Sequence, residues 1–360
     1  MHEEYSLQPR ISVVGAGHVG CALAFDLAER GYDVTIRTLP GHDGYSSQVS
    51  ANGGMLTANG ALSGCVHVGV GDGFSELSER YMFITVPSQG HDAVLMELST
   101  IDLLHCTIIF INGNGIGLKA SKYLNARRIM DTATSPYSSR VNADGTISIR
   151  GIKAKVQLAA LPLVTERRER DEIDSLFRMP LTWSSNLLEI FFTGLNGVIH
   201  APAALMNFGW IESTKGDFYF YKQGMSPGVC SIIEAADRER LAVAAAYGCP
   251  VDSALTTFNR NYCTNAASLH EFASITVAHN KTKGVQTRFL DQDVPYWLVF
   301  CSELGRQASV PTPFLDLIIL LASTIRGVPF RIVGRTLKSM GLQGLSHESI
   351  YNVFQGTVLV

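Results

Sequence analysis

The sequence predicts an α/β protein that consists of an N-terminal parallel-sheet domain and a C-terminal all-helical domain. In the first half, short β-rich runs alternate with helical patterns, as in parallel sheets whose strands are joined by helices. In the second half, apolar residues recur at helical spacing and few strand-like runs occur. The chain has 360 residues, of which 46% are hydrophobic, so there is enough material to bury two cores.

The predicted elements follow one another in the order that this fold requires. Strands are expected at residues 11–14, 34–37, 81–86, 107–111 and 128–132, and helices at 19–29, 92–98 and 166–177. Further β-like runs at 146–150 and 156–161 predict that the same sheet is extended.

The helical half begins near residues 180–186, where Trp183 and two serines precede a helical pattern. Its clearest helices are expected at 238–247 and 314–325. We therefore expect a sheet domain over residues 1–185 and a helical domain over residues 186–360. An active site is expected in the cleft between two such domains.

Composition argues against several classes of protein. The 29 basic and 32 acidic residues give a net charge of -3, which predicts neither nucleic-acid binding nor electrostatic attachment to a membrane. Seven scattered cysteines without a CxxC motif argue against a disulfide framework or a zinc site, and favour a reducing, cytoplasmic location. The N-terminus has no apolar signal region, and the apolar run at 317–322 is too short to span a bilayer.

A glycine-rich motif follows the first predicted strand. Gly15-Ala16-Gly17-His18-Val19-Gly20 matches G-x-G-x-x-G and opens the first helix, which is the setting that gives this motif meaning. Gly15 is expected to make the tight turn, Gly17 to let the backbone approach a pyrophosphate, and Gly20 to allow close packing of helix and strand. The motif predicts a Rossmann-type dinucleotide-binding domain over residues 1–185. A glycine-rich turn without a ligand is the alternative.

The end of the second strand bears on the choice of cofactor. NAD sites usually place Asp or Glu there, whereas this chain has Arg37 and Thr38. A guanidinium suits a 2′-phosphate, so NADPH is predicted and NADH is the alternative. Arg37 as an ordinary surface residue also remains open. Pro87, after the run at 81–86, is placed with the cofactor-binding residues.

The helical domain opens with a segment that contains a candidate acid–base group. Asn196 and His200 stand four residues apart and so share one face of a helix, which Pro202 is expected to kink or end. A histidine can exchange protons near neutral pH. From composition alone, a packed histidine bonded to neighbouring backbone is the favoured interpretation.

A second segment in this domain joins an arginine to an aspartate. Asp293 precedes Pro295 and a long apolar helix, a position typical of a helix N-cap. Arg288 lies five residues before Asp293. A guanidinium presents a planar fork that matches a carboxylate, so Arg288 is either a surface residue or an anchor for an acid substrate.

Several motifs together resemble the octopine/nopaline type of opine dehydrogenases, over nearly the whole chain. Besides the glycine motif and the Cys21-Ala22-Leu23-Ala24 that follows it, the resemblance rests on Ala133-Thr134-Ser135-Pro136-Tyr137-Ser138-Ser139-Arg140, Phe218-Tyr219-Phe220-Tyr221, Asp237-Arg238-Glu239-Arg240, Ser302-Glu303-Leu304-Gly305-Arg306, Val310-Pro311-Thr312-Pro313 and Gly334-Arg335-Thr336-Leu337.

The resemblance implies that an amino acid and an α-keto acid form an imine, which NAD(P)H then reduces to a secondary amine. The family's catalytic histidine matches His200, its partner aspartate Asp293, and its keto-acid arginine Arg288. Asn196 and Ser139 are placed at the substrates. Ser139 stands where relatives often have Cys, so the amine specificity is open. Gln292, where relatives often have Glu, is expected to change local polarity without loss of chemistry.

Two other functions remain as alternatives. Reductases of the ketopantoate or 3-hydroxyacid type generally have a catalytic lysine early in the second domain, and residues 186–207 contain none. A nonenzymatic NADP(H)-binding sensor would not need His200, Asp293 and Arg288 together. The amino acid is open, pyruvate and 2-oxoglutarate are both candidate keto acids, no metal is expected, and a homodimer is one option for the assembly.

Overall fold

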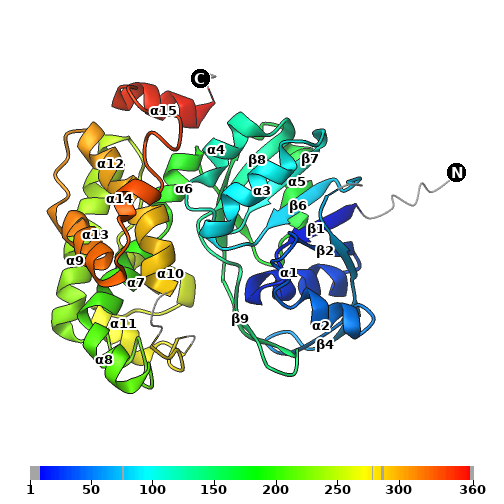
Figure 1. The fold of residues 1–360 in the computed structure, drawn as a ribbon, viewed down its shortest axis with the longest axis horizontal. Helices are drawn as coiled ribbons and strands as arrows, with labels where there is room; N and C mark the ends of the chain where they lie inside the picture. Colours follow the sequence, from blue (N-terminus) through cyan, green and yellow to red (C-terminus); the bar gives the residue numbers. More distant parts are fainter. Residues whose placement is uncertain (1–8, 75–76, 278, 285–287, 357–360) are drawn as a thin grey trace, which may run out of the picture. The chain divides into compact units, whose positions relative to one another are not determined.

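The computed structural model describes residues 9–74, 77–277, 279–284 and 288–356. The chain forms two compact units, Met1–Trp183 and Ser184–Val360. In the described residues every strand lies in the first unit, and the second is built from helices (Figure 1). The predicted α/β class, with a parallel-rich sheet followed by a helical domain, is confirmed.

An eight-stranded sheet forms the centre of the N-terminal unit. In spatial order its strands are β12 (Leu181–Trp183), β11 (Val156–Leu161), β8 (Ala126–Thr132), β7 (Leu103–Phe110), β6 (Tyr81–Ile84), β1 (Arg10–Val14), β2 (Asp33–Thr38) and β5 (Gly69–Asp72). Neighbours run parallel except β11 and β8. The chain progresses in opposite directions from β1 and from β6, so a topological switch point lies between these two strands, where α/β sheets bind their ligands.

A second sheet of four strands lies in the same unit. Its order is β4 (Gly64–His67), β3 (Met55–Gly60), β10 (Ile147–Ile152) and β9 (Tyr137–Val141). The run at 146–150 was expected to extend the central sheet, and this expectation is wrong, because β10 pairs with β3 and β9 instead. The run at 156–161 does extend the central sheet, as β11.

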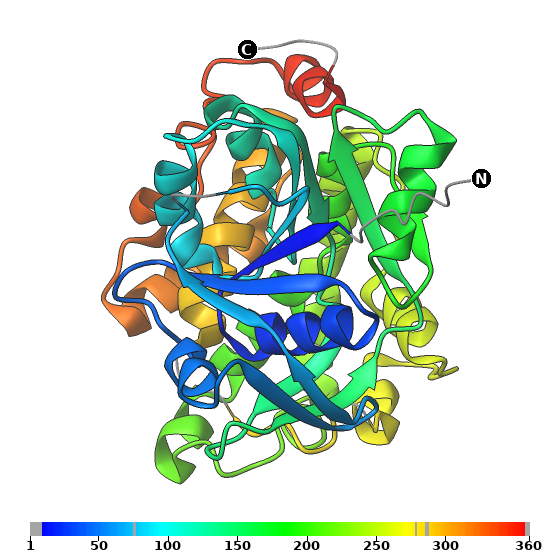
Figure 2. The ribbon, with the colours of Figure 1, turned by 90° about the vertical axis from the view of Figure 1, so that its right-hand side faces the viewer.

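The helices of this unit cover both faces of the central sheet. They are α1 (His18–Glu29), α2 (Ser46–Ala51), α3 (His91–Leu98), α4 (Ile116–Tyr123) and α5 (Arg167–Ser175), with a 3₁₀ turn η1 (Ser88–Gly90). Helix α1 packs between the two sheets (Figure 2), which explains why it is apolar on nearly all sides. Helices α3 and α4 cover the opposite face. With both faces buried, the central strands carry almost continuous apolar runs.

The C-terminal unit is a bundle of helices. They are α6 (Leu187–Thr193), α7 (Asn196–Met206), α8 (Phe208–Thr214), α9 (Pro227–Ala246), α10 (Ala254–Tyr262), α11 (Leu269–Ile275), the π-helix η2 (Phe289–Leu298), α12 (Val299–Gln307), α13 (Pro313–Arg326), α14 (Phe330–Val333) and α15 (His347–Gln355). The helix expected at 238–247 begins much earlier, because Ser226 caps α9 and Pro227 fits its first turn.

The stretch Leu187–Met206 is long and apolar enough to cross a membrane by length and composition. However, 83% of its apolar window is buried inside the protein, which is the packing of a core helix. Pro202, which was expected to kink or end the helix, lies within α7 and does not end it.

A buried ion pair ties the bundle together. The Arg240 side chain on α9 is fully buried and lies 2.7 Å from Asp237 one turn earlier. Its guanidinium also donates to the carbonyl oxygens of Phe192, in the last turn of α6, and Asp252, before α10. The second Asp237 oxygen accepts from the Ala254 amide at 2.8 Å. This part of the Asp237–Arg240 motif therefore joins three helices.

Candidate active site

The glycine motif forms the turn between β1 and α1, beside the switch point. Gly15 has φ +107°, which favours glycine, and a Cβ there would lie 3.0 Å from Thr85. A Cβ on Gly20 would lie 1.8 Å from the Gly15 carbonyl oxygen, so only glycine fits. A Cβ on Gly17 would meet no described atom within 4 Å. The loop thus has the tight turn, the close packing and the open approach that a pyrophosphate requires.

Neighbouring segments fix the glycine loop from two sides. The Ala16 carbonyl oxygen accepts from the Tyr45 amide at 2.8 Å, and Val19 packs against the core of the unit. On the other side, the Ser139 hydroxyl donates to the His18 carbonyl oxygen at 2.8 Å, and the Val141 amide donates to Nδ1 of His18 at 3.1 Å. Ser139, which the resemblance places at the amino-acid pocket, therefore bonds the cofactor loop from β9.

The two residues expected to choose the cofactor are engaged inside the sheet. Arg37 lies within β2, and its side chain is only 14% exposed. The guanidinium pairs with Glu79 at 2.7 Å and also donates to the Ser12 hydroxyl and the Gly73 carbonyl oxygen. The Thr38 hydroxyl donates to Asp72 at 3.2 Å and is buried.

This pairing bears on the predicted preference for NADPH. Burial would raise the pKa of the Glu79 carboxyl, but hydrogen bonds from Arg37 and Ser12 and the charge of Arg37 hold it below its usual value. Both groups are thus ionised partners near neutral pH. The binding of a 2′-phosphate by Arg37 stays a prediction, and in this structure its guanidinium balances the buried Glu79 carboxylate.

Pro87 follows β6 at the carboxyl edge of the central sheet, and it is exposed. Beside it, the buried Ser88 hydroxyl accepts from the Asn114 side chain at 3.0 Å. Asn114 follows β7 and adopts a left-handed conformation, with φ 55°. Two loops next to the switch point are therefore joined through side chains.

The His200 imidazole on α7 is held at both ring nitrogens. Nδ1 lies 2.9 Å from the Asp293 carboxylate, and Nε2 lies 3.0 Å from the Tyr221 hydroxyl. Asp293 is an acceptor, so Nδ1 carries a proton and Nε2 faces the hydroxyl. The packed histidine favoured from composition instead has two side-chain partners, and its side chain is 16% exposed. Such an imidazole can give or take a proton at Nε2.

Close packing of α7 against η2 brings His200 and Asp293 together. A Cβ on Gly197 would lie 2.3 Å from the Trp297 ring, so glycine lets the two helices approach. The Trp297 indole nitrogen donates to the Phe191 carbonyl oxygen at 3.1 Å, which fixes the ring. The Phe289 ring stacks on His200 with centroids 4.1 Å apart.

Asp293 is not the N-cap that its position before Pro295 suggested. It lies inside the π-helix η2, and its side chain is 4% exposed. Pro295 has no amide hydrogen and cannot close the α-helical bond to Asp291, so a widened turn is a physical outcome here. The Pro295 carbonyl oxygen accepts from the Arg335 amide at 2.8 Å. The helix thus starts before the proline and aims Asp293 at His200.

Tyr221 is a site residue that sequence reasoning missed. It is 4% exposed, and burial, followed by the nearby Tyr262 and Asp293, raises its pKa well above the usual value. The His279 ring stacks on it at 4.5 Å, and Nε2 of His279 lies 2.7 Å from the Tyr262 hydroxyl. The hydroxyl therefore stays protonated near neutral pH. Its only signal in the sequence was membership of the 218–221 motif.

The two remaining predicted substrate residues are close in sequence to residues of the His200 site. Asn196 is half-buried in the first turn of α7, one turn before His200. Arg288 is exposed and directly precedes Phe289, whose ring stacks on His200. In the part of the chain that the structure describes, the Arg288 guanidinium makes no ion pair or hydrogen bond.

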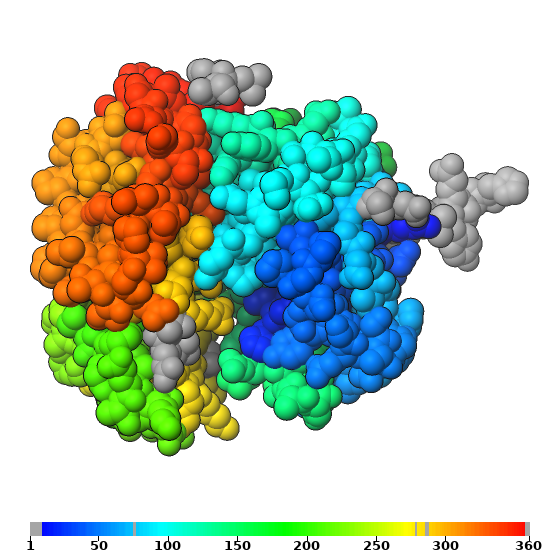
Figure 3. All heavy atoms as spheres, in the orientation of Figure 1, coloured from blue at the N-terminus to red at the C-terminus, as the bar shows by residue number. Residues whose placement is uncertain are grey.

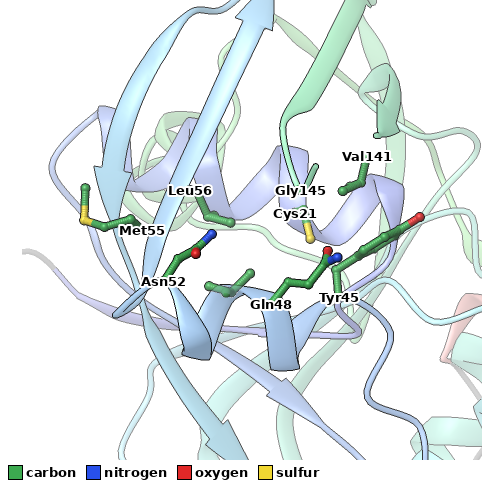
Figure 4. A pocket seen from close by; sticks show the side chains of 9 residues that line it. Cys21, Tyr45, Gln48, Asn52, Met55, Leu56, Val141 and Gly145 are labelled. Atoms are coloured by element: carbon green, nitrogen blue, oxygen red, sulfur yellow. The ribbon is translucent and has the colours of Figure 1, made fainter. Parts of the chain in front are cut away.

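A small hollow in the N-terminal unit lies between α1 and α2 (Figure 4). Figure 4 shows the side chains of Gln48 on α2, of Asn52 just after α2 and of Leu56 on β3 around it. Burial raises the pKa of the Cys21 thiol, which also lines it, to about 12. A thiol with such a pKa is not a nucleophile near neutral pH, so this hollow adds no chemistry to the site.

A glycine loop at the switch point, together with a helical unit whose imidazole is hydrogen-bonded at both nitrogens, defines a two-domain nicotinamide-dependent dehydrogenase. Residues 183–326 match the family described as NAD/NADP octopine/nopaline dehydrogenase, alpha-helical domain, and residues 11–162 match ketopantoate reductase PanE/ApbA. These matches support the opine dehydrogenase family for this chain.

Relatives and solved structures of this family cover most of the chain. The opine dehydrogenase of Arthrobacter sp. (strain 1C) is 27% identical over 94% of this chain and 97% of its own length. The D-nopaline dehydrogenase of Agrobacterium tumefaciens (strain T37) is 28% identical over 77% of this chain and 76% of its own length.

Two solved structures show the same fold. Octopine dehydrogenase with NADH and L-arginine has a TM-score of 0.74 at 16% identity, covering 98% of this chain and 99% of that one. Yersinopine dehydrogenase with NADP+ has a TM-score of 0.74 at 15% identity, covering 97% of this chain and 98% of that one.

Proposed function

We propose that this protein is an opine dehydrogenase, which joins an amino acid to an α-keto acid by reductive condensation. The observation that carries the proposal is the His200 imidazole, bonded to Asp293 at Nδ1 and to Tyr221 at Nε2. It lies in the unit that matches the octopine/nopaline dehydrogenase helical domain. A proton donor and acceptor is what imine formation and reduction need from the protein.

The reaction has two chemical parts. The amine nitrogen first attacks the keto carbon, and the carbonyl oxygen leaves as water, giving an imine. A hydride and a proton then add across the imine, giving a secondary amine with two carboxylates. We propose that His200 donates a proton to the carbonyl oxygen as this oxygen leaves as water. Asp293 fixes the ring and supports its positive form.

Tyr221 lies on the route that this proton takes. Because Nε2 of His200 faces the Tyr221 hydroxyl, a protonated ring donates to that oxygen. The hydroxyl can then pass its own proton outward. We therefore assign Tyr221 a role in positioning Nε2 or relaying its proton.

The glycine loop fits a dinucleotide, because Gly17 leaves open space at the N-terminus of α1. We propose that Gly15 to Gly20 hold the pyrophosphate, with Pro87 nearby on the carboxyl edge. When bound, the nicotinamide cofactor supplies the hydride. NADPH remains our proposal on one ground: β2 ends at Thr38 without the carboxylate that NAD sites usually have.

We propose that Arg288 holds the carboxylate of the keto acid and that Asn196 contributes from the first turn of α7. Arg288 is exposed and unpaired within the described residues, so its fork is available for an anion. Pyruvate and 2-oxoglutarate both carry the required carboxylate. The size of the pocket, rather than the arginine, has to distinguish them.

A substrate matrix tests the proposal. NADPH oxidation is followed with keto acid alone, with amino acid alone, and with both, using pyruvate and 2-oxoglutarate against a panel of amino acids. An opine dehydrogenase requires both substrates. Turnover with the keto acid alone would instead favour a hydroxyacid reductase. This alternative is tested because residues 11–162 match ketopantoate reductase. No oxidation in any arm would favour a cofactor-binding sensor.

A further inference from the structure

We infer that Tyr262 and His279 are positioning residues, which act together on the Tyr221 hydroxyl during proton exchange. The inference rests on the proposed function, in which this hydroxyl meets Nε2 of His200. The His279 ring stacks on the Tyr221 ring, with centroids 4.5 Å apart and an interplanar angle of 16°. Nε2 of His279 in turn lies 2.7 Å from the Tyr262 hydroxyl. Tyr262 thus reaches the acid–base group through His279.

The Tyr221 side chain needs support from outside its own segment. Tyr221 lies in the connection between α8 and α9, so no helix fixes the direction of its ring. A change of rotamer would carry the hydroxyl away from Nε2 of His200, because the hydroxyl stands at the far end of the ring. A flat partner ring restricts that movement. The stacked His279 ring is therefore suited to hold Tyr221 in the direction that meets His200.

Backbone contacts bring the two stacked rings together. The Phe220 amide donates to the Thr282 carbonyl oxygen at 2.8 Å. A Cβ on Gly284 would lie 2.5 Å from the Phe218 ring, so glycine permits a close approach of the two segments. Figure 3 shows the chain around α8, in green, and around α11, in yellow, side by side in the helical unit. His279, three residues before Thr282, is thereby placed next to the ring that it covers.

The Tyr262 ring is fixed by two helices. It lies in the last turn of α10 and packs against Phe272 of α11, with centroids 5.6 Å apart. Phe258, one turn earlier, stacks on the same Phe272 ring at 4.6 Å. Burial raises the pKa of the Tyr262 hydroxyl well above its usual value, so it stays protonated near neutral pH. Its hydrogen bond to Nε2 therefore orients the imidazole that lies on Tyr221.

The four side chains form a linear series. Tyr262 bonds His279, His279 stacks on Tyr221, and the Tyr221 hydroxyl meets His200. An outer member of such a series acts on the His200 imidazole only while the Tyr221 hydroxyl is present. An aromatic cluster that only packs would instead change stability, whether or not that hydroxyl is there. This dependence separates positioning from packing.

A double-mutant cycle of Tyr262→Phe and Tyr221→Phe tests this dependence. Tyr262→Phe is expected to lower kcat about threefold through the lost hydrogen bond, with unchanged KM values. Adding Tyr262→Phe to Tyr221→Phe is expected to lower kcat no further. Tyr247→Phe is the matched control, because the buried Tyr247 hydroxyl donates to the Leu304 carbonyl oxygen at 3.2 Å in the same unit. It is expected to keep the wild-type kcat.

His279 offers a second pair of variants. His279→Ala removes both the stack and the hydrogen bond and is expected to lower kcat about tenfold. His279→Phe keeps a flat ring without Nε2 and is expected to recover part of that loss. Circular dichroism shows whether each variant is folded, and the His279 variants decide the question if Tyr262→Phe is not.

The ¹⁵N resonance of Nε2 in His200 reports the same contact without any substrate. It is assigned by its loss in His200→Ala. The resonance is expected to shift in Tyr221→Phe and in Tyr262→Phe, and Tyr262→Phe is expected to add no shift to Tyr221→Phe. If the wild type turns over no pair of substrates, the proposed function fails, while this measurement still decides how Tyr221 is held.

Two results would overturn the inference. If Tyr262→Phe lowers kcat or shifts the resonance equally with and without the Tyr221 hydroxyl, it does not act through Tyr221. If folded Tyr262→Phe and His279→Ala leave both kcat and the resonance as in the wild type, the two residues only pack.

Discussion

The Tyr221 hydroxyl lies 3.0 Å from Nε2 of His200, while Asp293 lies 2.9 Å from Nδ1 of the same ring. Both nitrogens of the imidazole are therefore engaged before any substrate binds. The carboxylate decides which nitrogen carries the proton, and the hydroxyl meets the nitrogen that exchanges it. Stacking of His279 on Tyr221 and of Phe289 on His200 limits the movement of both rings.

Tyr221→Phe is expected to lower kcat about tenfold, the equivalent of one lost hydrogen bond, while the KM values for keto acid and cofactor change little. The ring is kept, so the stack with His279 is preserved. Tyr219→Phe is the control, because Tyr219 is 38% exposed two residues earlier. Steady-state kinetics of both variants make the comparison. If Tyr221→Phe has the same kcat as the wild type, the Tyr221 hydroxyl has no role in the reaction and the residue only packs in the site.

His200→Ala is expected to fold and to bind cofactor but to lose roughly 10²–10⁴-fold in kcat, the usual contribution of a general acid–base group. Asp293→Asn keeps the shape of the side chain but removes the charge that supports the protonated ring, so a smaller loss in kcat is expected. Asp291→Asn is the matched control on the same helix, since Asp291 pairs with Arg326 instead. Equal kcat values for Asp293→Asn and Asp291→Asn would contradict the assigned role.

The sequence predicted the glycine loop well because that feature is local. Strand, turn and helix follow one another within twenty residues, and both the positive φ of Gly15 and the contact of Gly20 with the Gly15 carbonyl oxygen arise within this turn. The same holds for the central strands, whose apolar runs reflect burial on both faces. Pairing of β10 with β3 was not predictable in this way, because β3 lies almost ninety residues earlier.

Side-chain partners distant in sequence were the harder part of the site. Glu79 follows Arg37 by 42 residues, and nothing in the strand pattern shows that the guanidinium turns toward it. Tyr221 had no chemical motif of its own, and Asp293 meets the His200 ring across 93 residues of sequence. The His200–Asp293 pair was expected only through the family resemblance.

Replacing Arg37 is expected to affect stability rather than cofactor choice. Arg37→Met leaves the buried Glu79 carboxylate without its partner, which costs about 3 kcal/mol of unfolding free energy. The ratio of kcat/KM for NADPH to that for NADH is expected to stay as in the wild type. Urea denaturation and kinetics with both cofactors measure the two effects. A ratio that moves toward NADH without loss of stability would restore Arg37 to the cofactor site.

The same pair predicts a pH dependence of stability. Glu79 has a folded-state pKa below its usual value, because hydrogen bonds and the charge of Arg37 outweigh its burial. Its contribution is therefore fully present above the unfolded-state pKa of glutamate and is lost as the pH falls through the lower, folded-state value. Glu79→Gln removes this titration. Urea denaturation from neutral to acidic pH is expected to show a shallower decline for Glu79→Gln than for the wild type.

Arg288 offers the sharpest test of substrate binding. Every α-keto acid carries a carboxylate beside its reacting carbonyl, and a two-pronged guanidinium can fix both the charge and the direction of that group. Lysine keeps the charge but loses the fork. Arg288→Lys is therefore expected to raise the keto-acid KM strongly and to lower kcat, while the KM for NADPH stays nearly unchanged.

The position of Arg288 links this anchor to the acid–base group. Phe289, the next residue, stacks on His200, and Asp293 lies one π-helical turn further on, so one short segment supplies the anchor, the ring support and the histidine's partner. Arg306→Lys is the control, because Arg306 is 62% exposed on α12 and pairs only loosely with Glu303. Kinetics that vary each substrate separately distinguish the roles. If the defect of Arg288→Lys is confined to the NADPH KM, the guanidinium binds the cofactor, and if there is no defect, it is a surface residue.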